Sequence, residues 1–365
     1  VFRHSLTPNL SSRHLGRRQG RLDVRMRSRS SAHQTRRSST LISANAESRP
    51  GTVRYGEFSK MIPVLAVIAI IALLYIQYVL IHLARLMQLD LVPAARKTEN
   101  VTAALWQGVL FHVFTFGLMY CMGRTILTHP GTIPEGSGWD LANSSSRNDR
   151  TDGSEVGVRL ETKTSGERRY CKWCLKYKPD RCHHCRVCNL CILRMDHHCP
   201  WVYNCIGFGN HKYFVLLLIY AELNLLLVNV TMFDTVWWST RVDVPVFTMC
   251  FVTAGAALGA VLLVLTSAFL GFHIYLIVRA LTTVEFCEKS TRREHQVASV
   301  YSRGVYQNIC AVLGPVPSLW LLPVSFPVGD GMTWAEFPGR RTFVEDSTVT
   351  PLEASVPSSV VGDKK

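Results

Sequence analysis

Residues 171–205 read CKWCLKYKPDRCHHCRVCNLCILRMDHHCPWVYNC and hold eight of the chain's twelve cysteines together with four histidines. Zinc in proteins is held by four tetrahedral ligands, most often Cys thiolates and His nitrogens. Cys171 and Cys174 form one Cys-x2-Cys pair, and Cys185 and Cys188 form a second. Two such pairs with histidines between them predict two Cys3His zinc sites. Two filled sites use eight of these twelve side chains and leave four over.

Four apolar runs flank this cluster, and each is long enough to cross a bilayer. Residues 61–81 carry no charge, and about 20 apolar residues suffice for a helix to cross the hydrocarbon core. Further runs cover residues 103–122, 213–233 and 246–278, each with at most one charged residue. We therefore expect four transmembrane helices, two before the cysteine-rich segment and two after it.

The charge pattern orients these spans. The net charge is +14, and residues 1–60 hold thirteen Lys or Arg against three Asp or Glu, whereas the loops at 85–100 and 234–245 are nearly balanced. By the positive-inside rule both termini and the cysteine-rich segment face the cytosol. A basic surplus beside a membrane span indicates attraction to anionic lipid, and the sequence holds no basic-aromatic nucleic-acid module. We expect the bilayer as a partner and no nucleic acid.

Cytosolic thiols stay reduced, which favours zinc over a disulfide-linked loop. The spacing leaves open which groups complete the two sites. The candidates are His183, His184, His197, His198, Cys182, Cys191, Cys199 and Cys205.

Several motifs point to one family. Asp196-His197-His198-Cys199 is followed by Pro200-Trp201, and Thr282-Thr283-Val284-Glu285 follows the fourth apolar run. Tyr301, Gly304 and Asn308 lie further on, before Gly329-Asp330-Gly331. In these motifs residues 61–331 resemble the DHHC-type zinc-containing protein S-acyltransferases (palmitoyltransferases).

The resemblance implies an α-helical polytopic membrane protein with four transmembrane helices and a cytosolic two-zinc cysteine-rich domain between helices 2 and 3. Residues 1–60 are expected to form a basic disordered tail, with a transit peptide as the alternative. The other expected parts are transmembrane helices 1 and 2 (61–134), a flexible linker (135–169), the zinc domain (170–212), helices 3 and 4 (213–280), a cytosolic segment with the TTxE and C-terminal motifs (281–331), and a tail (332–365).

The resemblance also assigns roles within the cluster. It implies that the first zinc is held by Cys171, Cys174, His184 and Cys191, and the second by Cys185, Cys188, His198 and Cys205. Asp196, His197 and Cys199 are then free for catalysis. Cys199 is the expected nucleophile, active as a thiolate, with His197 as its base and Asp196 orienting that imidazole. Both zinc ions are structural, because all four positions on each are filled.

The implied reaction moves a long-chain acyl group from palmitoyl-CoA to Cys199 and then to a cysteine of a substrate protein. Cytosolic or membrane-associated proteins are the expected acceptors, at the Golgi, the ER or the plasma membrane. The expected acyl-CoA contacts are Trp201, Phe214, Glu222 and Asn224, with Arg181 and Lys212 facing the CoA phosphates, and Arg279 as a further cation. Interhelical hydrogen bonding is the alternative for Glu222 and Asn224, and interfacial anchoring is the alternative for Trp201.

Two other functions fit a cysteine-rich membrane protein less well. A catalytically inactive zinc adaptor has no need of a free thiol at Cys199, and a RING-type ligase needs a further Cys-x2-Cys pair after Cys205. The sequence also departs from the family at two positions. His129 stands where members usually have Asp, and Cys182 stands where many have Ser; we expect Cys182 to be an exposed bystander thiol.

Overall fold

The computed structural model describes residues 58–135, 139–140, 161, 167–291, 299–325 and 327–334. The basic tail and most of the expected linker and C-terminal tail lie outside the described residues. All helices and strands from Lys60 onward belong to one unit of the chain.

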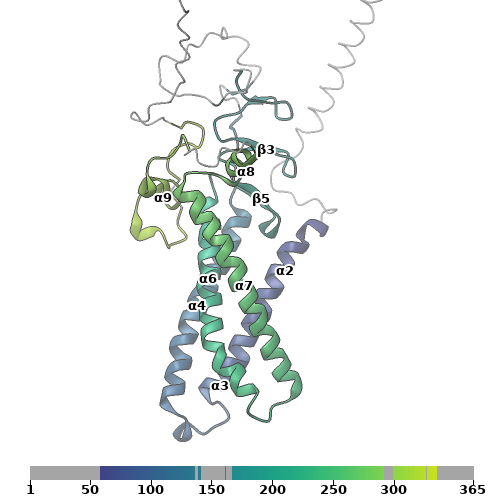
Figure 1. Cartoon of the computed structure of the whole chain (residues 1–365), viewed down its shortest axis with the longest axis vertical. Helices are drawn as coiled ribbons and strands as arrows, with labels where there is room; N and C mark the ends of the chain where they lie inside the picture. The colour runs from purple at the N-terminus through teal and green to yellow at the C-terminus, as the bar shows by residue number, and fades with distance from the viewer. Residues whose placement is uncertain are drawn as a thin grey trace, which may run out of the picture. The chain divides into compact units, whose positions relative to one another are not determined.

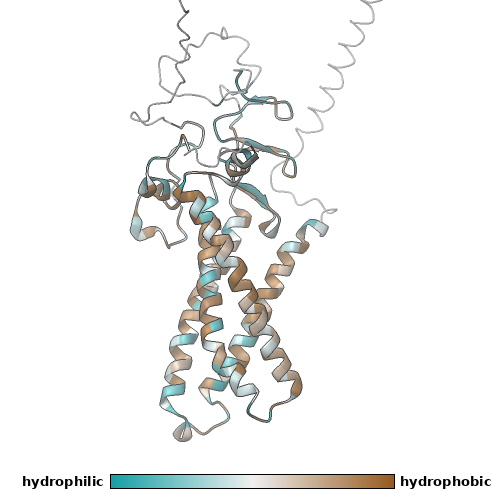
Figure 2. Ribbon diagram, viewed as in Figure 1, coloured by the Kyte–Doolittle hydropathy of each residue, from teal (hydrophilic) through white to brown (hydrophobic). Residues whose placement is uncertain are grey.

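Four long helices in the described part of the chain are apolar enough to cross a membrane, which confirms the predicted spans. Their apolar faces are evident in Figure 2. Each begins or ends several residues beyond the predicted apolar run, except the fourth, because a helix continues past the hydrocarbon into polar surroundings. They are α2 (Phe58–Gln77), which continues as a π-helical turn η1 (Tyr78–Leu83) and α3 (Ala84–Met87), then α4 (Thr98–Leu127), α6 (His211–Ser239) and α7 (Val246–Val278); η2 (Pro93–Ala95) lies in the first loop.

Helix α6 is the centre of the membrane part and packs against α4 and α7. Figure 1 shows α4 and α6 side by side, with α7 crossing them and α2 diverging toward its N-terminal end. Polar contacts join α6 to the π-helical turn. The Tyr78 hydroxyl lies 2.9 Å from Thr231 Oγ1, and His82 Nδ1 lies 2.7 Å from Thr235 Oγ1. Buried groups in a bilayer need such internal partners.

The cysteine-rich domain is built from three short antiparallel hairpins that share one turn geometry. In each, the residue directly before the second strand has a positive φ: Leu175 (54°), Asn189 (54°) and Tyr203 (47°). This left-handed residue reverses the chain tightly enough to bring cysteines on both sides of a turn together. The strands are β1 (Tyr170–Cys171) with β2 (Lys176–Tyr177), β3 (His183–Cys185) with β4 (Leu190–Ile192), and β5 (His197–Cys199) with β6 (Asn204–Ile206), the last pair joined through η3 (Pro200–Val202).

The segment after α7 ties the cysteine-rich domain to the adjacent ends of the membrane-spanning helices. It contains α8 (Thr283–Thr291), α9 (Val305–Leu313) and η4 (Pro317–Leu319). Asn308 donates to the carbonyl of Val278 at the end of α7 (2.9 Å), and Arg194 of the zinc domain donates to the carbonyl of Ala311 (2.8 Å). These bonds fix the cysteine-rich domain at one end of the helices.

Candidate metal centres and active site

Two groups of side chains have the donors and the spacing for zinc. Cys171, Cys174, His184 and Cys191 form the first group, and Cys185, Cys188, His198 and Cys205 form the second. Their ligand atoms lie together within each group, as the two expected sets require.

The separations between ligand atoms agree with tetrahedral zinc. Zn–S bonds of about 2.3 Å and Zn–N bonds of about 2.0–2.1 Å place neighbouring ligand atoms about 3.4–3.8 Å apart. In the second group the sulfurs of Cys185, Cys188 and Cys205 lie 3.7, 3.5 and 3.5 Å from His198 Nδ1. In the first group His184 Nδ1 lies 3.3 Å from the Cys174 sulfur and 4.0 Å from the Cys191 sulfur. The residues present therefore fit two zinc ions.

The second group holds both strands of the hairpin that carries Cys199. His198 on β5 is directly opposite Cys205 on β6, and Cys199 is opposite Asn204. Asn204 donates to three carbonyls at the end of α4, including those of Thr125 and Thr128 at 3.0 Å. A metal at this group and the end of α4 together fix the position of Cys199.

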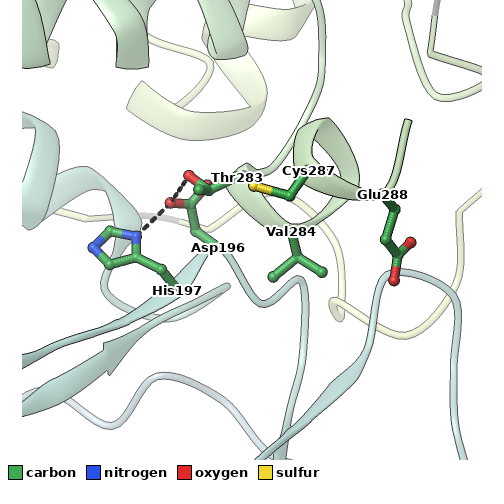
Figure 3. A pocket seen from close by; sticks show the side chains of 6 residues that line it. All are labelled: Asp196, His197, Thr283, Val284, Cys287 and Glu288. Carbon is green, nitrogen blue, oxygen red and sulfur yellow. Dashed lines mark hydrogen bonds and ion pairs between the residues drawn. The ribbon is translucent and has the colours of Figure 1, made fainter. Parts of the chain in front are cut away.

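Asp196 and His197 form a hydrogen-bonded pair beside this hairpin. His197 Nδ1 donates to Oδ2 of the fully buried Asp196 at 2.6 Å. Asp196 also accepts two hydrogen bonds from Thr283, one from its amide and one from its hydroxyl. Figure 3 shows the hydroxyl bond. Burial by itself would raise the pKa of Asp196, but the hydrogen bond from His197 and the charges of nearby imidazoles hold that pKa well below its usual range. Asp196 is therefore a carboxylate.

The other side of His197 faces the Cys199 thiol. Burial would lower the pKa of His197, but its hydrogen bonds to Asp196 and Cys199 raise that pKa to about 9. Cys199 is 5% exposed and belongs to an apolar cluster with Phe214 and Leu218 of α6 and Ile277 of α7. The Phe214 ring meets the His197 ring edge to face, with centroids 5.2 Å apart. The Cys199 thiol, the His197 imidazole and the Asp196 carboxylate thus lie in a series, with the thiol in the apolar helix cluster and the carboxylate at the other end.

A cavity of about 320 Å³ opens beside the carboxylate end of this series. Figure 3 shows its six lining side chains, which come from β5 and the residue before it and from α8. They are Asp196, His197, Thr283, Val284, Cys287 and Glu288. Cys199 is not among them, so this opening borders Asp196 and His197 but not the thiol.

The residues expected to contact an acyl chain lie in different settings. Trp201 is 56% exposed, whereas Phe214 is buried. Glu222 accepts hydrogen bonds from Thr266 and Ser267 of α7. Asn224 donates to Thr115 Oγ1 of α4 at 2.9 Å. Glu222 and Asn224 therefore both make interhelical hydrogen bonds, which is the alternative that the sequence left open for them.

The expectation that Arg181 and Lys212 face CoA phosphates is wrong. Arg181 is 2% exposed, and its guanidinium binds Glu285 through two hydrogen bonds of 2.6 and 2.9 Å. Lys212 is 3% exposed, and its Nζ donates to the carbonyls of Leu319 and Val324 at 2.8 and 2.7 Å. Both cations are used inside the protein, to hold the segment after α7.

Cys182 is also not the exposed thiol that the sequence suggested. It is fully buried and packs with the ligands Cys171 and Cys191. His129 takes up the turn after α4, where its Nδ1 accepts a hydrogen bond from the Gly131 amide at 3.2 Å. Cys182 thus lies in a packed interior, and His129 lies in a local turn.

Three residues near the site make contacts that no local sequence pattern predicts. Thr283 belongs to the TTxE motif, but its contact with Asp196 spans 87 residues and cannot be read from spacing. His211 begins α6 and His273 lies near the end of α7, and both are buried beside Asp196. His211 falls just before the predicted third run and His273 falls inside the fourth, and no sequence pattern places either of them beside Asp196.

Comparison with known proteins agrees with this geometry. Residues 164–290 match the family model described as DHHC palmitoyltransferase. The chain is 38% identical over 178 residues to palmitoyltransferase ZDHHC15 of Xenopus laevis, covering 47% of this chain and 51% of that protein. It is 37% identical over 196 residues to palmitoyltransferase ZDHHC2 of Mus musculus, covering 53% of each, and 39% identical over 174 residues to the Homo sapiens ZDHHC2, covering 47% of each. The chain thus spans about half the length of the curated relatives that it matches.

Proposed function

Since residues 164–290 match the family model of DHHC palmitoyltransferases, in a chain with four helices long and apolar enough to cross a membrane, we propose that this protein is a membrane-embedded protein S-acyltransferase. Its donor is a long-chain acyl-CoA such as palmitoyl-CoA, and its acceptors are cysteines of cytosolic or membrane-associated proteins. The observation that carries the proposal is the buried series Cys199, His197 and Asp196, with the thiol against the apolar helix cluster.

The first step forms an acyl-enzyme. Cys199 gives its proton to His197, and the thiolate attacks the thioester carbonyl of the acyl-CoA. The bond between that carbonyl carbon and the CoA sulfur breaks, and CoA leaves as a thiol after taking the proton from His197. Asp196 orients the imidazole through Nδ1 and stabilises it while it is charged.

The second step repeats this chemistry in the opposite direction. A substrate cysteine gives its proton to His197 and attacks the thioester on Cys199. The acyl group moves to the substrate, and Cys199 leaves as a thiolate that recovers the proton. No other reactant is needed, because one thioester is exchanged for another in each step.

The two zinc ions have a structural part in this proposal. Cys171, Cys174, His184 and Cys191 would hold one, and Cys185, Cys188, His198 and Cys205 the other, so that no ligand position remains for substrate. Their ligands cross-link the three hairpins, and His198 with Cys205 keeps Cys199 in register opposite Asn204.

The acyl chain is proposed to enter the bilayer side of the site. Each CH₂ group of the acyl chain that is buried in hydrocarbon contributes about 0.8 kcal/mol to binding, so a nucleophile at the membrane face is favoured. Phe214 packs with Cys199, and Trp201 lies two residues after Cys199 in the sequence. Phe214 and Trp201 are therefore proposed to contact the acyl chain near the thioester. Glu222 and Asn224 lie further along α6, where their interhelical bonds would shape the end of the chain's path. Arg279, half-buried at the end of α7, is the remaining proposed contact for a CoA phosphate.

The proposed topology follows from the charge pattern. Both termini and the zinc domain are placed in the cytosol, where acyl-CoA and reduced substrate cysteines are found. The proposed location is the Golgi, the ER or the plasma membrane.

Acyl transfer to the enzyme itself tests the function. The purified full-length chain is incubated with labelled palmitoyl-CoA, and the label is released with hydroxylamine, which cleaves thioesters. We expect labelled wild type, unlabelled Cys199→Ser, and labelled Cys182→Ser, which removes another buried thiol of the same domain. Equal labelling of Cys199→Ser and wild type would show that Cys199 is not the nucleophile. An unlabelled wild type would favour the inactive adaptor.

A further inference from the structure

A third group of metal-binding side chains lies beside the proposed catalytic residues. Asp196, His211 and His273 each offer one ligand atom, and these atoms all lie within 4.8 Å of one another. They come from three elements: the residue before β5, the first turn of α6 and the last third of α7. None of the three belongs to either cysteine-rich group.

The two histidines of this group are buried. His211 is 3% exposed and His273 is 1% exposed. Both ring nitrogens of His211 and Nδ1 of His273 lack a hydrogen-bond partner among the residues that the structure describes. Buried polar nitrogens are almost always paired with another group, so this grouping points to a ligand. The rings of Phe214 and Phe269 pack against His273, with centroids at 5.0 and 4.6 Å. Its polar neighbours are Asp196, His211 and the His197 ring, whose centroid lies 5.8 Å away.

Asp196 retains capacity for one further contact. A carboxylate has about four lone-pair positions. His197 Nδ1 and Thr283 Oγ1 take two on Oδ2, and the Thr283 amide takes one on Oδ1. One position on Oδ1 remains, and a cation can use it without displacing the hydrogen bond that orients His197.

We propose that Asp196, His211 and His273 form a third metal site, which binds a divalent zinc-class cation. Two imidazoles and one carboxylate are donors that zinc and similar transition metals accept, and three protein ligands leave one coordination position open. The site binds more weakly than the cysteine-rich sites, because it has no thiolate ligand.

Binding at this site regulates the acyl transfer. A cation on Oδ1 draws the negative charge of Asp196 toward itself and weakens the hydrogen bond that Oδ2 accepts from His197. Formation of the acyl-enzyme then slows. This consequence rests on the proposed function, whereas the metal site itself does not.

The metal content of the purified full-length chain tests the site directly. After dialysis against a weak chelator we expect two zinc ions per chain in wild type, and a third on titration with zinc. His211→Phe and His273→Phe should each keep two and gain no third. His112→Gln, which alters a histidine of α4 outside the group, should still gain it. Retention of two zinc ions shows that each variant has folded. A wild type that never exceeds two, or a third zinc that both Phe variants still bind, would overturn the proposal.

Cobalt distinguishes the ligands at the third site. Added to the zinc-loaded chain, Co²⁺ should give visible ligand-field bands without a thiolate charge-transfer band, and both Phe variants should lose them. A charge-transfer band would mean that cobalt occupies the cysteine-rich sites and would contradict the assignment.

The rate of acyl-enzyme formation tests the regulatory consequence. Zinc at the concentration that fills the third site should slow labelling of Cys199 several-fold in wild type. If zinc does not slow labelling but the metal counts are as expected, the regulatory consequence is overturned and the metal site is not. If the chain is never labelled, with or without zinc, the proposed function is contradicted instead.

Discussion

Thr283 donates hydrogen bonds to both carboxylate oxygens of Asp196, from its amide to Oδ1 at 2.9 Å and from its hydroxyl to Oδ2 at 2.8 Å. Thr283 is the first residue of α8, so Asp196 also accepts from the positive end of that helix. This contact joins the strand that carries the proposed nucleophile to the segment that follows the last span. The TTxE motif thereby becomes part of the support for the proposed catalytic residues.

The hydroxyl of Thr283 can be removed while the shape of the side chain is kept. In Thr283→Val the amide bond to Asp196 remains and the hydroxyl bond is lost. A hydrogen bond to a charged group contributes about 1.5–3 kcal/mol, so we expect acyl-enzyme formation to slow about tenfold or more. The rate of label uptake from palmitoyl-CoA measures this. Thr283→Ser keeps the hydroxyl and should label at close to the wild-type rate; equal slowing of both variants would mean that the methyl group matters and the hydrogen bond does not.

The buried pair Arg181 and Glu285 should contribute to stability rather than to CoA binding. The Arg181 guanidinium also lies over the rings of Tyr301 and Trp334, at 4.6 and 4.9 Å from their centroids. Removing one partner of a buried ion pair leaves an unpaired charge and costs about 3–5 kcal/mol. We therefore expect Glu285→Gln and Arg181→Met each to lower the thermal unfolding temperature of the purified protein.

The double variant is the informative control for this pair. Arg181→Met combined with Glu285→Gln leaves no unpaired charge, so its loss should be smaller than the sum of the two single losses. Glu288→Gln, on the exposed side of the same helix, should unfold like wild type. Additive losses in the double variant would show that the two side chains act independently.

The sequence predicted the architecture well because its signals are local. Four apolar runs specify four spans, and Cys-x2-Cys pairs specify zinc ligands, since both depend on residues near one another in the chain. The two ligand sets needed the family resemblance as well, because eight candidates at similar spacing allow several assignments. The structure places the ligand atoms of those sets together at distances that suit zinc.

The roles of single charged residues were less predictable. Arg181 and Lys212 lie near the expected membrane face, and position alone suggested that they bind phosphate. Their actual partners, Glu285 and the carbonyls of Leu319 and Val324, are about a hundred residues away in sequence. The burial of Cys182 and the grouping of His211 with His273 also depend on long-range packing. No periodicity or spacing records contacts of this kind.

Removing a ligand from each cysteine-rich group should separate their roles. Cys171→Ala and Cys188→Ala should each reduce bound zinc from two ions to one, as measured by elemental analysis of the purified chain. Cys188→Ala should also abolish labelling of Cys199, because the second group holds the β5–β6 hairpin through His198 and Cys205. Cys182→Ala should keep both ions. Retention of two zinc ions in Cys188→Ala would refute the proposed second ligand set.

The contact between α2 and α7 gives a prediction on the membrane part. Gln77 is 1% exposed, and its Nε2 donates to the carbonyl of Val252 at 2.9 Å. A Cβ added at Gly255 would overlap the Gln77 amide, whereas a Cβ at Gly271 on the same helix meets nothing within 4 Å. Gly255 is therefore needed for the close approach of the two helices, as small residues are in membrane helix pairs generally.

We expect Gly255→Ala to lower the thermal unfolding temperature in detergent, because the methyl group displaces Gln77 and breaks its hydrogen bond inside the bilayer region. Overpacking of this kind costs about 1–3 kcal/mol. Gly271→Ala introduces the same methyl group into open space and should be neutral or slightly stabilising, since Ala favours helix over Gly by about 1 kcal/mol. If the two variants unfold at the same temperature, the Gln77 contact does not hold α2 against α7.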